Sequence, residues 1–204
     1  MDNSDHWNAV YSKKTEAELS WHQDDPSVTL DLMKWAGLAT TCSVIDIGAG
    51  TSRLMDRLLD LGLNDLSALD LSDNALAASR ARLGPRGRPV KWIVGNITSW
   101  EPTRTYDIWH DRAVFHFLVN PADQIAYIQR LSRSVGPGAH AIMATFALDG
   151  PEKCSGFPVA RYSPASLAET LGQSFSLVTH RFYLHRTPWD NPQSFQYSLF
   201  RRVG

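Results

Sequence analysis

Short apolar runs alternate with segments of helical composition along the middle of the chain. The runs of strand length are residues 43–48, 66–71, 90–94, 106–110 and 139–146. The helical segments are residues 51–61, 73–83 and 124–135, the last of them followed by Gly-Pro-Gly. Apolar runs of this kind indicate strands that are buried on both faces. Their alternation with helices predicts βαβ units, and hence a parallel sheet covered by helices on both faces.

Both ends of the chain depart from this alternation. Residues 1 to about 40 have helical composition, with a break at Pro26. Near the other end, residues 163–172 predict a helix that Ser163 would cap, and two β-rich runs follow it. The short connection between these runs favours an antiparallel hairpin. We expect a single α/β domain over residues 1–204, with a helical lid over 1–40 and a catalytic core over 43–204.

The composition is that of an ordinary globular protein. Of 204 residues, 43% are hydrophobic and 20% charged, and the net charge is -1, so a nucleic-acid partner is not expected. The two cysteines, Cys42 and Cys154, form neither a CxxC pair nor a disulfide framework, and no metal site is expected. No apolar run reaches the length of a membrane span, roughly 18 residues. We therefore expect a cytoplasmic protein without a membrane partner, and the sequence is compatible with a monomer.

The segment SVIDIGAGTSRL, residues 43–54, reads as a buried strand that enters a glycine turn and then a helix. Gly48 and Gly50 remove side chains at the carboxyl end of the strand, where ligands bind in open α/β sheets. A dinucleotide fingerprint needs glycine at the sixth position of the turn, and Arg53 stands there, so an NAD-dependent reductase is disfavoured. Asp46 would not help a pyrophosphate, but it could receive an ammonium group. The alternative is a tight strand–helix turn that binds nothing.

The order D-x-G-x-G resembles motif I of class I S-adenosylmethionine-dependent methyltransferases, with Ser52 in place of the usual third glycine. That cofactor has an amino-acid end and no phosphate. Asp70 follows Gly50 by twenty residues, a spacing at which a carboxylate can bind both ribose hydroxyls.

The resemblance covers nearly the whole chain and implies the seven-stranded methyltransferase sheet. It also assigns the adenine site, where Asn96 would hydrogen-bond the amino group. Ile97 would pack on the adenine ring, and Leu71 would line the site beside the Asp70 carboxylate. For Ile97 the alternative is an ordinary core position.

Residues 106–118, YDIWHDRAVFHFL, should lie beside the transferred methyl group. They contain no N-P-P-Y motif, which argues against methylation of an adenine or glutamine nitrogen. The pair Asp111-Arg112 resembles the aspartate–arginine pair of thiopurine methyltransferases. The tail FYLHRTP resembles the end of tellurite-resistance methyltransferases. The aromatic positions that match those over the thiopurine-methyltransferase cofactor are Trp7, Tyr11 and Trp21-His22.

The candidate catalytic residues are Asp111, Arg112 and His116. Arg112 would orient an anionic group or the cofactor carboxylate, unless it only pairs with Asp111. His116 would accept a proton if residues 112–116 are helical, unless it is structural. Trp21 could stabilise the sulfonium cation of the cofactor by about 0.5–2 kcal/mol, unless it only packs. His110 lies within a strand and is expected to pack.

A thiol, with a pKa of about 8.5, needs little help from an enzyme to become a nucleophile near neutral pH. We therefore favour a small-molecule substrate that is a thiol, a chalcogen or a thiopurine-like compound. Cys154 could contact it, although an ordinary loop cysteine is the alternative. A lysine methyltransferase similar to the small elongation-factor enzymes is a rival, but those carry Asp-Lys-Gly-Thr where this chain has 111–114. A non-catalytic cofactor-binding protein is the remaining alternative.

Overall fold

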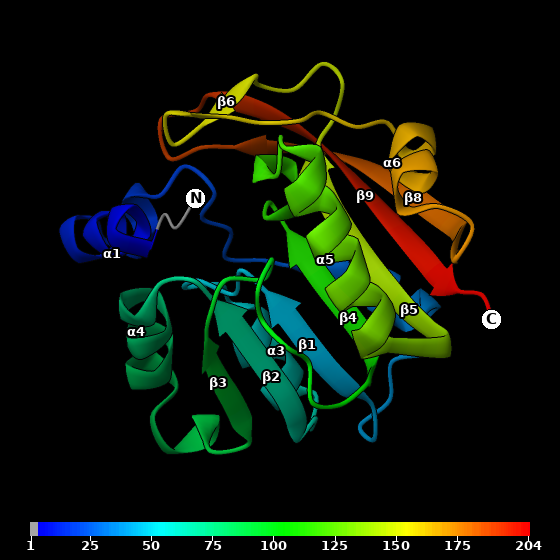
Figure 1. Cartoon of the computed structure of the whole chain (residues 1–204). Helices are drawn as coiled ribbons and strands as arrows, with labels where there is room; N and C mark the ends of the chain where they lie inside the picture. The colour runs from blue at the N-terminus through cyan, green and yellow to red at the C-terminus, as the bar shows by residue number, and fades with distance from the viewer. Residues whose placement is uncertain (1–3) are drawn as a thin grey trace.

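A computed structural model describes residues 4–204, which form a seven-stranded sheet in the order β3-β2-β1-β4-β5-β9-β8 (Figure 1). The strands are β1 Ser43–Ile47, β2 Asp65–Asp70, β3 Val90–Val94, β4 Tyr106–Arg112, β5 Val135–Phe146, β8 Phe175–Arg186 and β9 Pro192–Arg202. The first five strands pair in parallel. β9 is antiparallel to both β5 and β8, which confirms the predicted antiparallel hairpin. The sheet reverses its order beside β1, where β1 lies between β2 and β4, and ligands bind at such a point in doubly wound folds.

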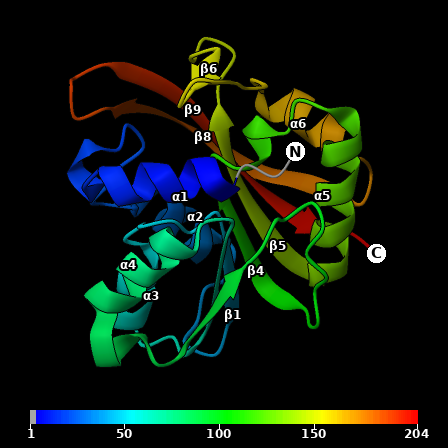
Figure 2. The ribbon, with the colours of Figure 1, turned by 60° about the vertical axis from the view of Figure 1, so that its left-hand side comes forward.

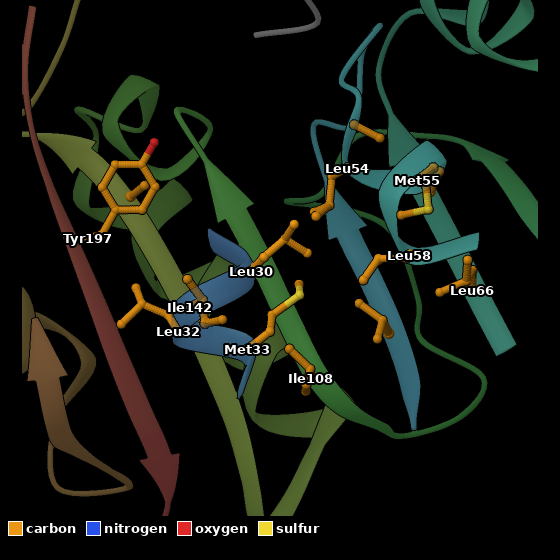
Figure 3. Close-up of a cluster of buried hydrophobic side chains, with 14 of the residues drawn as sticks. Leu30, Leu32, Met33, Leu54, Met55, Leu58, Leu66, Ile108, Ile142 and Tyr197 are labelled. Atoms are coloured by element: carbon orange, nitrogen blue, oxygen red, sulfur yellow. The ribbon is translucent and has the colours of Figure 1, made fainter. Parts of the chain in front are cut away.

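Helices cover both faces of the sheet, as predicted. α2 Ser27–Trp35, α3 Leu54–Asp60 and α4 Asp73–Leu83 contribute to one buried cluster, and α5 Pro121–Ser134 and α6 Pro164–Leu171 to the other. Figure 3 shows part of the first cluster. Successive side chains of a strand point to opposite faces, so Ile108 joins the first cluster and Trp109 joins the second.

The helix after β4 differs from the expected 124–135. It begins at Pro121, and the side chain of Asn120 accepts a hydrogen bond from the Ala122 amide, as an N-cap does. Residue 135 is already the first of β5, so the Gly-Pro-Gly segment lies inside a strand rather than ending a helix. β4 also runs two residues further than expected, to Arg112.

The N-terminal segment is only partly helical. α1 spans Ser4–Lys13, and a short 3-10 helix, η1, spans Glu16–Glu18. Thr15 lies between them, and its amide donates a hydrogen bond to the Glu18 carboxylate at 2.8 Å. This contact starts a new turn in place of a continuous helix. Figure 2 shows α1 beyond the end of the sheet, on the side of α4. Residues 1–3 of the predicted lid lie outside the described residues.

Candidate functional site

The turn between β1 and α3 requires glycine at both positions that the sequence singled out. Gly48 has φ +67°, and a Cβ there would lie 2.1 Å from Val114 Cγ2. Gly50 has φ +51°, and a Cβ there would lie 2.6 Å from the Tyr11 hydroxyl oxygen. Positive φ strains a residue that has a Cβ, and the short distances to Val114 and Tyr11 add to the cost of any other residue. Ser52, at the position of the usual third glycine, accepts a hydrogen bond from the Leu54 amide at 3.0 Å, which helps α3 to begin.

A cavity of about 460 Å³ lies against this turn, at the carboxyl ends of β1, β2 and β4. A smaller hollow of about 50 Å³ adjoins it. Both are lined by Tyr11, Trp21, Gly48 and Arg112. The structure therefore brings residues from the N-terminal segment, the glycine turn and the end of β4 to one site.

Asp46 lies under the smaller hollow and is 2% exposed. Its Oδ1 lies 2.7 Å from Nδ1 of His110, whose Nε2 lies 3.2 Å from the hydroxyl oxygen of Thr29. Oδ2 of Asp46 is buried and has no hydrogen-bond partner among the described residues. His110 is buried, as expected of a residue that packs, but its ring is also hydrogen-bonded to a predicted site residue. A histidine at the end of the predicted strand 106–110 was the available signal, whereas nothing in the sequence singled out Thr29.

Asp70 is held by two backbone amides. Its Oδ2 accepts from Gly50 at 2.8 Å and its Oδ1 from Ser72 at 2.7 Å. Burial raises the pKa of the Asp70 carboxyl to about 6. The residue lines the large cavity together with Leu71 and Ile97. Ile97 is also a member of the core, and its contact with adenine stays a prediction.

Asn96 lines the same cavity, but its side-chain oxygen is already engaged. That oxygen accepts from the backbone amide of Thr98 at 3.0 Å and from its hydroxyl at 2.9 Å. The group left for a ligand is the amide nitrogen, which is a donor. An adenine amino group is also a donor, so the expected pairing does not fit, and an adenine ring nitrogen suits this side chain better.

Arg112 is fixed by three contacts at the end of β4. Its Nε donates to the Tyr197 hydroxyl at 2.9 Å, its Nη1 donates to the Trp21 carbonyl at 2.8 Å, and its guanidinium lies 4.9 Å from the Phe195 ring centroid. Nη2 is buried without a partner among the described residues. The alternative that Arg112 only pairs with Asp111 is wrong, since successive strand residues point to opposite faces and the two side chains have different partners.

Asp111 is fully buried and does not line the cavity. Its Oδ1 accepts from the Val114 amide at 2.9 Å, and its Oδ2 accepts from the Phe115 amide at 3.1 Å and the Tyr127 hydroxyl at 2.5 Å. Burial raises the pKa of this carboxyl to about 6. We therefore correct its predicted catalytic role: Asp111 shapes the turn after β4.

His116 is also fully buried and outside the cavity lining. It lies in a 3-10 helix, η3 Phe115–Phe117, so the α-helical spacing from Arg112 does not apply. Its Nδ1 accepts from the Phe146 amide at 3.4 Å. Burial, aided by the charge of Arg112, lowers the pKa of the ring to about 3. This position contradicts the prediction that His116 removes a proton from the substrate.

Aromatic side chains close the site from the N-terminal side. Trp7 makes edge-to-face contacts with Trp21 at 5.6 Å and with Phe117 at 5.4 Å between ring centroids, and Tyr11 lies 6.0 Å from Trp21. The rest of the wall includes Phe157, which sequence reasoning missed. Interlocked rings of this kind make a rigid, apolar cover.

Cys154 lies in β6 Lys153–Cys154, which pairs with β7 Phe157–Pro158 beside the cavity. Burial raises the pKa of the Cys154 thiol to about 11. At neutral pH this side chain is therefore a protonated, apolar part of the wall.

Among residues 4–204, no helix is long and apolar enough to cross a membrane. Within the same range, no group of three or more His, Cys, Asp and Glu side chains could hold a metal ion.

Comparisons with known proteins agree with this geometry. The methyltransferase domain family matches residues 44–138. A curated relative, the eEF1A lysine and N-terminal methyltransferase of Mus musculus, is 21% identical over 136 residues, which is 65% of this chain. The match spans only 19% of the length of the mouse protein.

Two solved structures share the fold at low sequence identity. One, described as the conversion of a disulfide bond into a thioacetal group during echinomycin biosynthesis, has a TM-score of 0.76 and 22% identity, with 98% of this chain and 92% of that chain covered. The N-methyltransferase NodS from Bradyrhizobium japonicum, in complex with S-adenosyl-L-homocysteine, has a TM-score of 0.73 and 13% identity, with both chains fully covered at 100%. The sheet order is that of the class I methyltransferase fold, and the family match over residues 44–138 indicates an S-adenosylmethionine-dependent methyltransferase.

Proposed function

We propose that this methyltransferase acts on a small molecule whose nucleophile is a thiol or a similarly soft atom, a chalcogen or a thiopurine-like sulfur. The observation that carries the proposal is that the described cavity wall offers few bases, since it contains no histidine and only two carboxylates, those of Asp70 and Asp123. The ionisable side chains in that wall are Tyr11, Asp70, Arg112, Asp123 and Cys154. A substrate that ionises by itself near neutral pH suits such a site.

The wall residues with shifted pKa values make poor bases. Burial and the nearby Asp70 raise the pKa of Tyr11, and burial raises that of Cys154 to about 11. Asp70 accepts hydrogen bonds from two backbone amides, and we assign it to the ribose rather than to the acceptor. A thiol has a pKa of about 8.5 and supplies its own thiolate, whereas a lysine amine with a pKa of about 10.4 needs deprotonation.

The chain's own polar atoms fit the cofactor. Two opposite charges, Asp46 and Arg112, line the smaller hollow, and each has one buried polar atom without a partner among the described residues. An amino-acid end supplies the matching ammonium and carboxylate groups. Asp70 would bind the ribose hydroxyls, and Leu71, Asn96 and Ile97 would surround the adenine. When bound, S-adenosylmethionine supplies a methyl group on a sulfonium cation.

The remaining residues orient the substrate and exclude water. Trp21 lines both hollows and offers an aromatic face that favours a cation. Trp7, Phe117 and Phe157 provide an apolar surface for the acceptor. Placing a nucleophile in line with the methyl group then accounts for most of the rate. The resemblance to thiopurine and tellurite-resistance methyltransferases supports a role for Arg112 in orienting an anionic group or the cofactor carboxylate. Asp111, which does not line the cavity, has no such role.

The solved structure whose description names a disulfide and a thioacetal has sulfur chemistry of its own, and we take it as support for a sulfur acceptor here. A protein lysine acceptor is the second candidate, favoured only by the 21% identity to the mouse enzyme. Against it stands the aromatic cover, which encloses the acceptor region.

The test is to incubate the protein with S-adenosylmethionine and measure formation of S-adenosylhomocysteine. The acceptor panel contains thiols of graded pKa, 6-mercaptopurine, selenite, tellurite and purified elongation factor 1A. We expect turnover with a thiol or chalcogen, at rates that follow the thiolate concentration. Methylation of the elongation factor alone would transfer the assignment to lysine, and cofactor binding without turnover of any acceptor would favour a non-catalytic protein.

A further inference from the structure

We infer that His110, supported by Thr29, is a positioning residue that holds Asp46 in one orientation and so presents its Oδ2 to the ammonium group of the cofactor. The inference rests on the proposed binding mode of S-adenosylmethionine and concerns a residue that binds no ligand itself. Its starting point is a buried three-residue chain of hydrogen bonds that crosses from α2 through β4 to β1.

The two strands place Asp46 and His110 side by side. The residues are register partners on the parallel strands β1 and β4, so their side chains leave the sheet on the same face. Oδ1 of Asp46 lies 2.7 Å from Nδ1 of His110, and the two residues are only 2% and 3% exposed. A carboxylate buried this deeply is unfavourable unless it is paired, and the imidazole pairs with only one of its oxygens.

The Asp46 carboxylate only accepts hydrogen bonds, so it requires the proton on Nδ1 of His110, and Thr29 supports that tautomer. Its hydroxyl lies 3.2 Å from Nε2 of His110 and can donate to that nitrogen. The proton of the neutral ring then sits on Nδ1 and is donated to Asp46, in the usual way that a second partner fixes a histidine tautomer. With Oδ1 occupied, rotation of the Asp46 carboxylate would break this bond.

The consequence is a single unsatisfied acceptor directed at the smaller hollow. Oδ2 of Asp46 is buried and has no partner among the described residues, and Asp46, His110 and Thr29 all line the hollow. A buried acceptor without a partner carries a penalty that a ligand donor removes. An ammonium group has both the charge and the donors to do so, and a ligand without one gains nothing here.

The experiment compares two substitutions of the same residue. In His110→Asn the side-chain amide nitrogen stands near the place of Nδ1 and can still donate to Asp46. In His110→Gln it stands nearer the place of Nε2 and loses that bond. Affinities are measured by calorimetry with S-adenosylhomocysteine, decarboxylated S-adenosylmethionine and 5′-methylthioadenosine, which lacks both the ammonium and carboxylate groups. Circular dichroism confirms that each variant is folded.

We expect His110→Gln to weaken binding of both ammonium-bearing ligands by about tenfold or more, the scale of a hydrogen bond to a charged group. Its affinity for 5′-methylthioadenosine should be unchanged, and His110→Asn should bind all three ligands within about threefold of the original protein. Arg112→Met is the contrasting variant, because it should weaken S-adenosylhomocysteine more than the decarboxylated ligand.

Equal losses for all three ligands in His110→Gln, or no loss, would overturn the inference and leave His110 as a fold residue. If His110→Gln does not fold, Thr29→Val takes its place, with a smaller loss that is again confined to the ammonium-bearing ligands. Failure of the proposed binding mode looks different, because the unsubstituted protein would then bind neither S-adenosylhomocysteine nor 5′-methylthioadenosine.

Discussion

Nη1 of Arg112 donates a hydrogen bond to the backbone carbonyl oxygen of Trp21 at 2.8 Å. The contact joins the carboxyl end of β4 to a segment 91 residues earlier in the chain. A side chain at the reacting end of the sheet thus also holds the aromatic cover in place. Substitution of Arg112 should therefore have two effects, one on the cofactor and one on the cover.

Arg112→Lys keeps the positive charge but cannot make the three contacts of a planar guanidinium. We expect affinity for S-adenosylhomocysteine to fall by about tenfold and hydrogen exchange to increase around Trp21. Calorimetry and exchange mass spectrometry measure the two effects. Arg53→Lys is the control, because Arg53 pairs with Glu16 elsewhere on the N-terminal segment. A fully active Arg112→Lys enzyme with unchanged exchange would contradict both roles.

Cofactor binding should depend on the ionisation of Asp70. Its pKa is raised to about 6 by burial, and ribose hydroxyls donate best to the ionised carboxylate. Because the protonated form dominates below that pH, affinity should fall as the pH falls through about 6. Calorimetric titration with 5′-methylthioadenosine tests this, since that ligand retains the ribose but lacks the amino-acid end.

The Asp70→Asn variant is the matched control for this titration. It should bind weakly at every pH and lose the inflection near 6. An inflection that persists in Asp70→Asn would assign the titration to another group, and unchanged affinity would remove Asp70 from the ribose site.

Tyr127→Phe should destabilise the fold without altering the cavity wall. The Tyr127 hydroxyl donates to Asp111 at 2.5 Å and accepts from Trp109 Nε1 at 3.0 Å, and all three side chains are fully buried. Leaving such groups unpaired costs about 1–3 kcal/mol, which urea denaturation will measure. Tyr162→Phe loses a single hydrogen bond, to Gln124, and should cost less. Equal losses in the two variants would contradict the role of Tyr127.

His116→Gln should keep methyltransferase activity and show a characteristic dependence of stability on pH. The pKa of His116 is lowered to about 3 in the folded protein, against about 6.5 in an unfolded chain. Between these values the unfolded state binds more protons, so the original protein loses stability as the pH falls below about 6.5. The variant lacks this loss, and its stability relative to the original protein should improve toward acid pH.

Urea denaturation at several pH values measures that difference, with turnover recorded at neutral pH. Loss of activity in a stable His116→Gln protein would restore His116 to a catalytic role. A stability difference that does not change with pH would mean that the ring is not held neutral.

Asn8→Ala should loosen α1 from the core. The Asn8 side-chain oxygen accepts from the Ser72 hydroxyl at 2.7 Å, at the N-terminus of α4. Losing this bond should increase proteolysis within α1 and weaken S-adenosylhomocysteine by a few fold, because Trp7 and Tyr11 then cover the site less of the time. Lys13→Ala, at the exposed end of the same helix, serves as the control. Unchanged proteolysis would mean that aromatic packing alone holds the lid.

The sequence by itself determined the sheet and the position of the glycine turn. Buried parallel strands are continuous apolar runs, and Gly48 and Gly50 occupy a turn whose positive φ angles favour glycine. Asp46 and Asp70 were found for a similar reason: their positions relative to the strand ends are local properties of the chain. The antiparallel hairpin followed from the shortness of its connection.

Only the tertiary structure decided which polar side chains face the cavity. Ala113 adopts φ +70°, and because no glycine stands there, the sequence does not predict this turn. After the turn His116 is buried, whereas Arg112 before it lines the cavity. The partnership of His110 with Asp46 depends on the register of β1 and β4, and that with Thr29 on the packing of α2. These two contacts of His110 join residues 64 and 81 positions apart. Periodicity and spacing describe neighbours along the chain, whereas the choice between a buried and a ligand-facing side chain is made by packing.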